Sequence, residues 1–372
     1  MSEQRRPAGR VAHVSSVHVW TDNRVHYREA ASLARAGHAV ALIAVDGPVQ
    51  GPPAGVRVVK LPRRGRLRRL ALGGVQAVRT AWALGPDVFH LHDPELAWAA
   101  PLLRAAGRKV VYDAHEDFPA QVKNKPYLAP WAVPLAVAGA HLALALARRA
   151  NHIVAATETI ARRFPPAKTT VVRNYPPLRP AEAAAPPLAA RRAAAVYIGA
   201  VSAIRGAAVM AQAAASPLFP PAWRLRVAGR LRGRAAQALA GRPGQVDYLG
   251  ELPPEAARDL LLDSRVGLVL FGDTAAHRDA LPTKMFEYLA AGLPVIASDF
   301  PLWRQIIGRH EAGQLVDQTD PAAVARAIAR YAADPELLKL HGANARRLAV
   351  SQLNWASEEA ALAAVYRSLL AA

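Results

Sequence analysis

The sequence predicts an α/β protein that contains two doubly wound parallel sheets. Short runs of apolar, often β-branched residues alternate with longer helical patterns along most of the chain. The runs are continuously apolar rather than alternating, which is typical of parallel strands covered on both faces. The length of 372 residues is also enough for about two domains.

The first half of the chain contains seven short apolar runs with the character of β-strands. A helical pattern over Arg24–Ala36 follows the first run and ends at Gly37, in a position where glycine is favoured after a helix. A second helical pattern covers Glu95–Ala106. The predicted strands are Val11–Ser15, Ala39–Val45, Val56–Leu61, Asp87–His92, Lys109–Asp113, Asn151–Ala155 and Thr169–Arg173.

A proline-rich segment separates the two halves. Tyr175–Arg192 holds five prolines without clear periodicity, which predicts a linker over residues 176–192 between domains at 1–175 and 193–353. The last segment, Asn354–Leu370, has the apolar spacing of an amphipathic helix. The strands predicted in the second half are Ala193–Ile198, Leu225–Ala228, Gln245–Leu249, Val266–Leu270 and Pro294–Ala297.

The charge of the chain is strongly positive and unevenly distributed. Residues 1–180 hold 26 basic and 11 acidic side chains, or +15, and residues 181–372 hold 21 and 17, or +4, which together give +19. This excess indicates an anionic partner of the first half and leaves nucleic acid, an acidic lipid surface and an acidic substrate open. The absence of cysteine excludes disulfides and thiolate chemistry. Met1–Arg10 has no apolar secretory segment, so we expect a cytoplasmic protein.

Polar side chains follow two strands of the first predicted sheet. In doubly wound sheets, ligands bind at the carboxyl ends of the strands. These polar side chains can be interpreted in three ways. They can cap the following helices, bind a metal ion, or form an active site that uses His115 or a neighbouring carboxylate. The two groups of side chains are His90, His92, Asp93 and Glu95, and Asp113, His115, Glu116 and Asp117.

The loop after the first strand does not contain the glycine fingerprint of dinucleotide-binding proteins, which argues against such a cofactor. Asp22 and Asn23 can cap the helix that begins at Arg24. The start of that helix faces the predicted binding crevice and would favour an anion.

A sharper pattern occurs in the second half, where Pro282-Thr283 opens a short helix over Lys284–Ala291. Two carboxylates eight positions apart, Asp279 and Glu287, bracket its start. One can meet a sugar hydroxyl and the other a ribose diol, while the exposed amides of Thr283 and Lys284 meet phosphate.

The stretch from Leu281 to Ser298, Leu-Pro-Thr-Lys-Met-Phe-Glu-Tyr-Leu-Ala-Ala-Gly-Leu-Pro-Val-Ile-Ala-Ser, resembles the donor-site signature of retaining group 1 glycosyltransferases. The resemblance implies the GT-B architecture: two Rossmann-like domains facing a cleft, with the sugar nucleotide on the C-terminal domain and most of the acceptor on the N-terminal domain. It also implies that the final helix, 354–372, returns to the first domain. Further similar segments are 22–38, 112–117, 125–130, 172–176, 197–200 and 247–250.

The same resemblance implies roles for individual residues. Glu287 would bind the donor ribose, Asp279 takes the place of the first acidic residue of the family's pair, and His115 would touch the donor sugar near the reacting carbon; these three are the predicted catalytic residues. Arg205 matches the family's phosphate-binding lysine, whereas Ala200 replaces its arginine. The predicted donor-binding residues are Ser202, Arg205, Thr283, Lys284 and Glu287, and those of the acceptor side are Asp22, Asn23 and Glu116.

The implied reaction is sugar transfer with retained anomeric configuration, in polysaccharide biosynthesis, from a nucleotide sugar to a glycan or lipid-linked acceptor. The family needs neither a cofactor nor a bound metal, because cationic side chains and helix dipoles stabilise the leaving diphosphate. Two other functions are considered: a sugar-nucleotide epimerase or hydrolase of the same architecture, and a non-catalytic basic adaptor for membranes or nucleic acid.

Two features of the first half predict contact with a membrane surface. Arg63–Arg69 places five arginines within seven positions, which suits anionic headgroups, and a solvated loop is the alternative interpretation. The lack of interleaved aromatic residues disfavours nucleic acid. Tyr127–Ala147 is apolar except for His141, but its prolines, glycine and alanines argue against a transmembrane span. We therefore expect a peripheral protein on the cytoplasmic face of the membrane.

Overall fold

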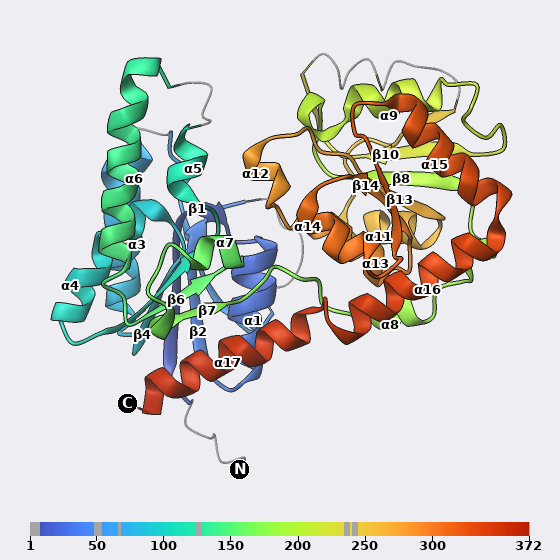
Figure 1. The fold of residues 1–372 in the computed structure, drawn as a ribbon. Coiled ribbons are helices and arrows are strands. Elements are labelled where there is room, and N and C mark those ends of the chain that lie inside the picture. The colour runs from blue at the N-terminus through green and yellow to red at the C-terminus, as the bar shows by residue number, and fades with distance from the viewer. Residues whose placement is uncertain are drawn as a thin grey trace, which may run out of the picture. The chain divides into compact units, whose positions relative to one another are not determined.

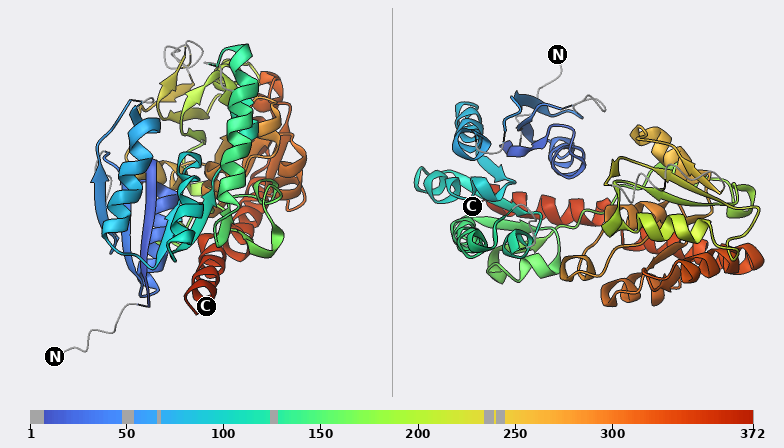
Figure 2. Two further views of the ribbon diagram at one scale, coloured as in Figure 1. Left: turned by 90° about the vertical axis from the view of Figure 1, so that its left-hand side faces the viewer. Right: turned by 90° about the horizontal axis from the view of Figure 1, so that it is seen from above.

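The computed structural model describes residues 8–47, 54–65, 68–123, 128–233, 239 and 245–371. The chain forms two compact units, the first comprising Met1–Asn174 with Trp355–Ala372 and the second comprising Tyr175–Asn354 (Figures 1 and 2). Each unit is a parallel sheet covered by helices on both faces, which confirms the predicted α/β class.

The sheet of the first unit has seven parallel strands in the order β3-β2-β1-β4-β5-β6-β7. The order reverses direction at β1, the switch point at which α/β sheets bind ligands. The strands are β1 (Arg10–Val19), β2 (Ala39–Val45), β3 (Arg57–Leu61), β4 (Val88–Leu91), β5 (Lys109–Ala114), β6 (His152–Ala155) and β7 (Thr169–Val171).

The helices of the first unit bury apolar residues against both faces of this sheet. One face is covered by α3, α4 and α6, through residues such as Ala77, Leu103 and Leu144. The other is covered by η1, α1 and α17. The helical segments are η1 (Asn23–Ala30), α1 (Ala31–Arg35), η2 (Arg69–Gly73), α3 (Gly74–Ala83), η3 (Pro94–Leu96), α4 (Ala99–Ala105), α5 (Phe118–Lys123), η4 (Pro130–Ala132), α6 (Val133–Ala147), α7 (Glu158–Ala161), η5 (Pro166–Lys168) and α17 (Trp355–Ala371).

The second unit has a six-stranded parallel sheet in the order β12-β10-β8-β13-β14-β15, and a separate parallel pair of β11 and β9. Its strand order also reverses, at β8. The strands are β8 (Ala194–Ile198), β9 (Val201–Ser202), β10 (Arg224–Ala228), β11 (Leu231–Arg232), β12 (Val246–Tyr248), β13 (Val266–Val269), β14 (Val295–Ser298) and β15 (Gly313–Val316).

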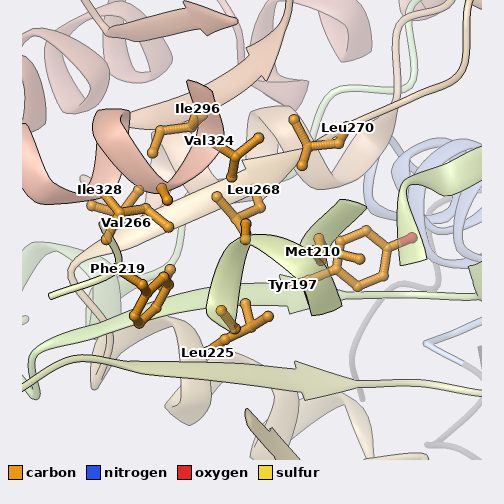
Figure 3. Packing of buried hydrophobic residues seen from close by; sticks show 14 of the residues in the cluster. Tyr197, Met210, Phe219, Leu225, Val266, Leu268, Leu270, Ile296, Val324 and Ile328 are labelled. Carbon is orange, nitrogen blue, oxygen red and sulfur yellow. The ribbon is translucent and has the colours of Figure 1, made fainter. Parts of the chain in front are cut away.

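Two apolar clusters lie on the two faces of this second sheet. In the one shown in Figure 3, Tyr197, Leu225 and Leu268 of the strands pack with Met210 and Val324 of the helices. The other contains Phe286 and Leu289 of α13. The helical segments are α8 (Pro180–Ala183), η6 (Leu188–Ala190), η7 (Ala203–Arg205), α9 (Ala207–Ala214), α11 (Pro254–Leu262), α12 (Ala275–Arg278), α13 (Thr283–Ala290), α14 (Pro301–Trp303), η8 (Arg304–Gly308), α15 (Pro321–Ala333) and α16 (Pro335–Ser351).

The C-terminal helix α17 belongs to the first unit. The Trp355 indole nitrogen donates to Ser32 Oγ at 2.8 Å, and the Tyr366 hydroxyl lies 2.8 Å from His90 Nδ1. The Lys109 ammonium also donates to the Leu369 carbonyl. The chain therefore leaves the first unit after Asn174 and re-enters it at Trp355.

The predicted linker and the first predicted helix differ from the sequence-based expectation. The segment predicted as a linker over 176–192 is packed on the second unit: its Arg191 is buried and donates to the Ala291 carbonyl at 3.0 Å. Its prolines and alanines conceal the helical turns α8 and η6. The helix expected over Arg24–Ala36 begins as a π-helix, η1, and continues as α1. Asp22 accepts from the amides of the first turn and fixes its start.

Candidate active site

Three buried histidines lie together in the centre of the first unit. His13 on β1 is the direct neighbour of His90 on β4, and His92 follows that strand. The three ring centroids are 4.5–5.1 Å apart. His90 and His92 therefore point to the same face of the sheet, the condition on which the metal interpretation of these two residues depends.

Asp113, at the end of β5, connects this cluster to His115. Its carboxylate accepts from Arg24 Nε and Nη2 at 3.1 and 2.8 Å, and from His115 Nε2 at 2.7 Å. Burial alone would raise the pKa of Asp113, but the charge of Arg24 and the contacts of His115 and His92 outweigh it and hold the pKa well below its usual range. Because the carboxylate binds the Nε2–H of His115, the Nδ1 of this partly exposed ring is left to meet a ligand.

The hydrogen bonds also fix the protonation of the buried rings. Burial lowers the pKa of His92 to about 4 and holds that of His13 well below its usual value, so both rings are neutral. His92 Nδ1 lies 3.2 Å from Asp113, which can only accept, so His92 carries its proton on Nδ1. His92 Nε2 then accepts from His13 Nδ1 at 2.9 Å. The chain His13–His92–Asp113 thereby holds the carboxylate that orients His115.

The same cluster contains side chains of the types that bind metal ions. Ligand atoms of His13, Glu29, His90 and His92 lie within 4.8 Å of one another. Both ring nitrogens of His92, however, are already used within the hydrogen-bond chain. The geometry therefore favours a role for these histidines in positioning Asp113 and His115. That the protein works without a metal stays a prediction.

His18 and Asp93 form a second ion pair next to this cluster. His18 Nδ1 lies 3.0 Å from the buried carboxylate of Asp93, which also accepts from the Ser16 amide at 2.6 Å. Burial opposes charge on His18, but the hydrogen bond and charge of Asp93 outweigh it and raise the pKa of His18 to about 9.

We expect this ion pair to make the stability of the first unit dependent on pH. A histidine whose pKa is raised on folding contributes stability that is fully present below pH 6.5 and is lost as the pH rises through about 9. The variant His18→Gln should show a flatter decline of Tm over this range, and His310→Gln serves as the control. Identical slopes for wild type and His18→Gln would refute the assignment.

The three residues predicted to contact the acceptor differ in exposure and in hydrogen bonding. The Asp22 carboxylate caps η1, accepting from the amides of Arg24 and Val25 at 2.8 and 2.9 Å. Asn23 and Glu116 are exposed. Asp22 thus has the capping role considered from the sequence, and its contact with an acceptor stays a prediction.

The second unit buries a lysine at the start of α13. Lys284 is only 9% exposed, and its Nζ finds no hydrogen-bond partner among the described residues. The Nζ lies 3.6 Å from the centroid of the Tyr197 ring, and 3.1 Å from the point where a side chain at Gly199 would begin. A larger residue at position 199 would therefore press on the lysine, and Gly199 also has the left-handed φ of +123° that favours glycine.

Other charged residues act on Lys284. Burial and the nearby charge of Arg205 hold the pKa of Lys284 well below its usual value, although Glu287 opposes this effect. The guanidinium carbon of Arg205 lies 5.7 Å from the centroid of the Phe271 ring. Two basic groups and an acid thus converge beside the amino end of a helix, where a buried amine lacks a hydrogen-bond acceptor. Such an arrangement is suited to an anionic ligand.

Glycines allow the loops around Lys284 to approach one another closely. A Cβ at Gly229 would lie 2.0 Å from the Gly199 carbonyl oxygen, so only glycine permits this contact. The Tyr197 hydroxyl donates to the carbonyl of Ala200 at 2.8 Å. Ala200, which stands where the family has arginine, therefore contributes its backbone to the loop. Ser202, the residue before η7, is partly exposed.

The two predicted carboxylates differ in exposure. Asp279 is exposed at the end of α12, whereas Glu287 lies partly buried on α13 among the groups that influence Lys284. The Trp303 indole nitrogen donates to the Ala280 carbonyl at 2.8 Å and thereby anchors the loop between α12 and α13. Thr283 begins α13 and is partly exposed. Of the predicted donor-site residues, the structure groups Arg205, Lys284 and Glu287.

Sequence reasoning did not identify several residues of the first-unit site. His13 and Glu29 were missed, as was the pairing of Arg24 with Asp113. A signal was available, because His13 interrupts an otherwise apolar strand and Arg24 and Glu29 lie within one amphipathic segment. The partners of these groups are distant in sequence, so the pattern alone did not reveal that they are buried together.

Comparison with known proteins identifies both units. Residues 23–175 match the family described as "Glycosyl transferase 4-like domain", and residues 179–348 match "Glycosyl transferases group 1". The chain belongs to the group 1 glycosyltransferases, and it is a glycosyltransferase of GT-B architecture.

A curated relative is the lipopolysaccharide core biosynthesis mannosyltransferase LpcC of Rhizobium leguminosarum bv. viciae. It is 31% identical over 157 residues, which is 40% of this chain and 43% of the relative. The match thus spans less than half of the relative's length.

Solved structures resemble nearly the whole chain. Sucrose-phosphate synthase from Thermosynechococcus elongatus has a TM-score of 0.73 at 20% identity, covering 98% of this chain and 100% of its own. HepE from Anabaena in complex with UDP-glucose has a TM-score of 0.68 at 16% identity, covering 97% and 100%. The Escherichia coli structure described as trehalose-6-phosphate bound with UDP-2-fluoro glucose has a TM-score of 0.69 at 13% identity, covering 97% and 99%. At these identities the likeness concerns the fold.

Proposed function

We propose that this protein transfers a sugar from a nucleotide-diphosphate sugar to a glycan or lipid-linked acceptor, with retention of the anomeric configuration. The observation that carries the proposal is the buried Lys284 Nζ, which has no hydrogen-bond acceptor among the described residues and lies near Arg205 at the start of α13. A diphosphate would supply that acceptor and would favour the protonated lysine. UDP and UDP-sugars are bound in the similar structures of HepE.

The donor would be held by the residues predicted for it. The diphosphate would meet Arg205, Lys284, Ser202 and the first amides of α13, and Glu287 would bind the ribose. In the transition state the bond between the anomeric carbon and the phosphate oxygen breaks, and negative charge gathers on the departing diphosphate. Cationic groups fixed in advance stabilise that charge without reorganisation.

The acceptor hydroxyl would attack from the face of the sugar that the diphosphate leaves. A bond forms between the acceptor oxygen and the anomeric carbon, and the hydroxyl proton passes to the departing phosphate. This step needs no enzyme nucleophile, so the exposed Asp279 is not required to act as one. The acceptor would lie on the first unit, near His115, Asp22, Asn23 and Glu116. We also propose that the protein works without a metal, in the cytoplasm and at the membrane surface.

A thermal-shift screen with UDP-, GDP- and other nucleotide sugars tests the donor site, followed by mass spectrometry of the product. Because the relative is a mannosyltransferase and UDP-glucose is bound in HepE, mannose and glucose donors come first. Arg205→Ala and Glu287→Ala should each weaken nucleotide binding by tenfold or more, whereas the exposed Arg326→Ala should not. No shift with any nucleotide sugar would overturn the proposal. Product formation without an acceptor would indicate the hydrolase or epimerase alternative.

We expect His115→Ala to reduce turnover by about 100-fold or more, a larger effect than its effect on stability, because the ring would act on the reacting sugar. Steady-state kinetics and a melting curve of the same preparation measure both quantities. His152→Ala is the control, since His152 lies at a strand start and bonds Thr170. Unchanged turnover in His115→Ala would remove this histidine from the site.

A further inference from the structure

The first unit exposes an apolar helix face. Trp131 of η4 is 81% exposed, and Leu135 and Leu142 of α6 are 73% and 61% exposed. Together with the exposed Ala138 and Ala145, they form one line at helical spacing, which we call the α6 stripe. Isolated exposed leucines are ordinary, but a continuous apolar line marks a surface that contacts something apolar.

The opposite side of α6 is part of the core. Ala140, Leu144 and Ala147 are buried and pack with the apolar cluster on one face of the first sheet. Among the described residues, Pro130–Ala147 is the one helical stretch long and apolar enough to cross a membrane by length and composition. Spanning a bilayer would pull these three residues out of the core, so the helix is suited to lie on a membrane surface (α6 in Figure 1).

The stripe ends in a cluster of basic residues. Arg148 and Arg149 are exposed and continue the line of Leu142 and Ala145 by one helical turn. Two more cations, Arg104 and Lys168, are bonded to this end of the helix, which we call the cationic end, and the backbone carbonyl of Arg163 also takes part. Arg104 donates to the Arg149 carbonyl at 2.8 Å, Arg148 to the Arg163 carbonyl at 2.7 Å, and Lys168 to the Arg148 carbonyl at 2.5 Å.

The charges of the cationic end are only partly balanced. Arg163 pairs with Asp117 at 2.7 Å. The residues from Pro130 to Ala147 include no Asp, Glu, Lys or Arg, and the exposed His141 is the one ionisable side chain among them, so the stripe offers no acid that would repel anionic headgroups. Burial and the charges of Arg104 and Arg149 lower the pKa of Lys168, which shows that the positive charges act on one another.

The membrane contact expected of the arginine-rich loop 63–69 stays a prediction. Arg66 lies outside the described residues. Three other arginines of the loop are bound within the protein: Arg63 to the Asp46 carbonyl, Arg64 to Gln76, and Arg69 to Glu95.

From these features we infer that the α6 stripe docks on an anionic lipid bilayer, with its apolar side chains at the acyl boundary and the cationic end on the headgroups. An apolar line that ends in several cations matches an acidic membrane surface, where each basic residue contributes about 1 kcal/mol. The inference deepens the proposed membrane location, but its test requires neither donor binding nor transferase activity.

Co-flotation of the full-length protein with vesicles tests this inference. Vesicles of equal parts phosphatidylglycerol and phosphatidylcholine are compared with vesicles of phosphatidylcholine alone. We expect binding to the acidic vesicles that weakens as salt is raised. The triple variant Trp131→Ser, Leu135→Ser, Leu142→Ser should lose binding and keep its Tm, because these side chains are exposed. Arg148→Gln with Arg149→Gln should reduce affinity about 30-fold, which corresponds to about 1 kcal/mol per arginine.

Leu340→Ser with Arg326→Gln, both exposed on the second unit, is the matched control and should bind as the wild type does. Failure of the wild type to bind acidic vesicles would overturn the inference, as would wild-type binding by the triple variant. Light scattering after gel filtration tests a different occupant of the face. A dimer that the triple variant dissociates would show that a second copy covers the stripe, which would also overturn it.

Discussion

Replacing Lys284 by methionine should abolish donor binding and at the same time make the free protein more stable. In the free protein Lys284 is 9% exposed and its Nζ lacks a hydrogen-bond partner among the described residues. An unsatisfied buried polar group costs about 1–3 kcal/mol, and methionine has similar length without that group. The expected gain is about 2–12 °C in the Tm of the second unit. Nucleotide-sugar affinity should fall at least 100-fold, because the diphosphate loses its buried cation.

The pH dependence of stability provides a second measurement on the same variant. A lysine whose pKa is lowered on folding binds fewer protons in the folded state than in the unfolded one. The contribution of Lys284 to the stability of the second unit should therefore rise with pH until the ordinary lysine range near 10.4 is reached, and Lys284→Met should lack this rise. Nucleotide-sugar binding by the wild type should take up a proton, measurable by calorimetry in two buffers of different ionisation enthalpy.

Lys339→Met is the matched control, since Lys339 is exposed on α16 and pairs with the exposed Glu336 at 3.6 Å. It should change neither Tm nor affinity. A Lys284→Met protein that melts below the wild type, or that binds nucleotide sugars normally, would contradict a ligand-binding role for this lysine.

Asp113→Asn should cause a large loss of stability, about 3–5 kcal/mol in urea unfolding, because it leaves the buried guanidinium of Arg24 without its main counter-ion. Turnover should also fall, since the amide no longer fixes the Nε2–H of His115. The contribution of Asp113 is present above the ordinary aspartate pKa of about 3.9 and is lost as the pH falls through its lowered folded value.

A double variant tests whether the loss of stability comes from the uncompensated charge of Arg24 or from the changed shape of the side chains. Arg24→Met combined with Asp113→Asn removes both charges and should recover part of the lost stability, because the uncompensated charge is gone. Turnover should stay low in the double variant, since His115 still lacks its carboxylate. Full stability in Asp113→Asn alone would show that Arg24 is adequately paired by Glu29, which lies 3.0 Å away.

Much of the fold could be predicted from the sequence because buried parallel strands are recorded locally as short apolar runs. Ala39–Val45 was predicted with the bounds of β2. The strand β15 (Gly313–Val316) was missed, because it contains a glycine and a glutamine and is mostly half-buried. The wrongly predicted linker shows the same limit, since Arg191 is held by a carbonyl of a residue one hundred positions away.

The site was less predictable because its properties come from burial. The motif placed Lys284 at the donor phosphate, but its lowered pKa depends on burial and on the charge of Arg205, which approaches through a loop distant in sequence. Asp279 and Glu287 are equivalent in the pattern, yet only Glu287 is among the groups that influence Lys284. Residue types and spacing indicated the chemistry, whereas the electrostatics required the fold.

The return of α17 to the first unit has a consequence for biosynthesis. Tyr366 and Trp355 supply buried contacts to His90 and Ser32, but they are made only after the whole of Tyr175–Asn354 has been translated. At ~5–20 residues per second, the ribosome needs about 10–40 s for that segment. Throughout this interval the nascent first unit exposes the face that α17 will cover, so the second unit can complete its fold first and the N-terminal unit last.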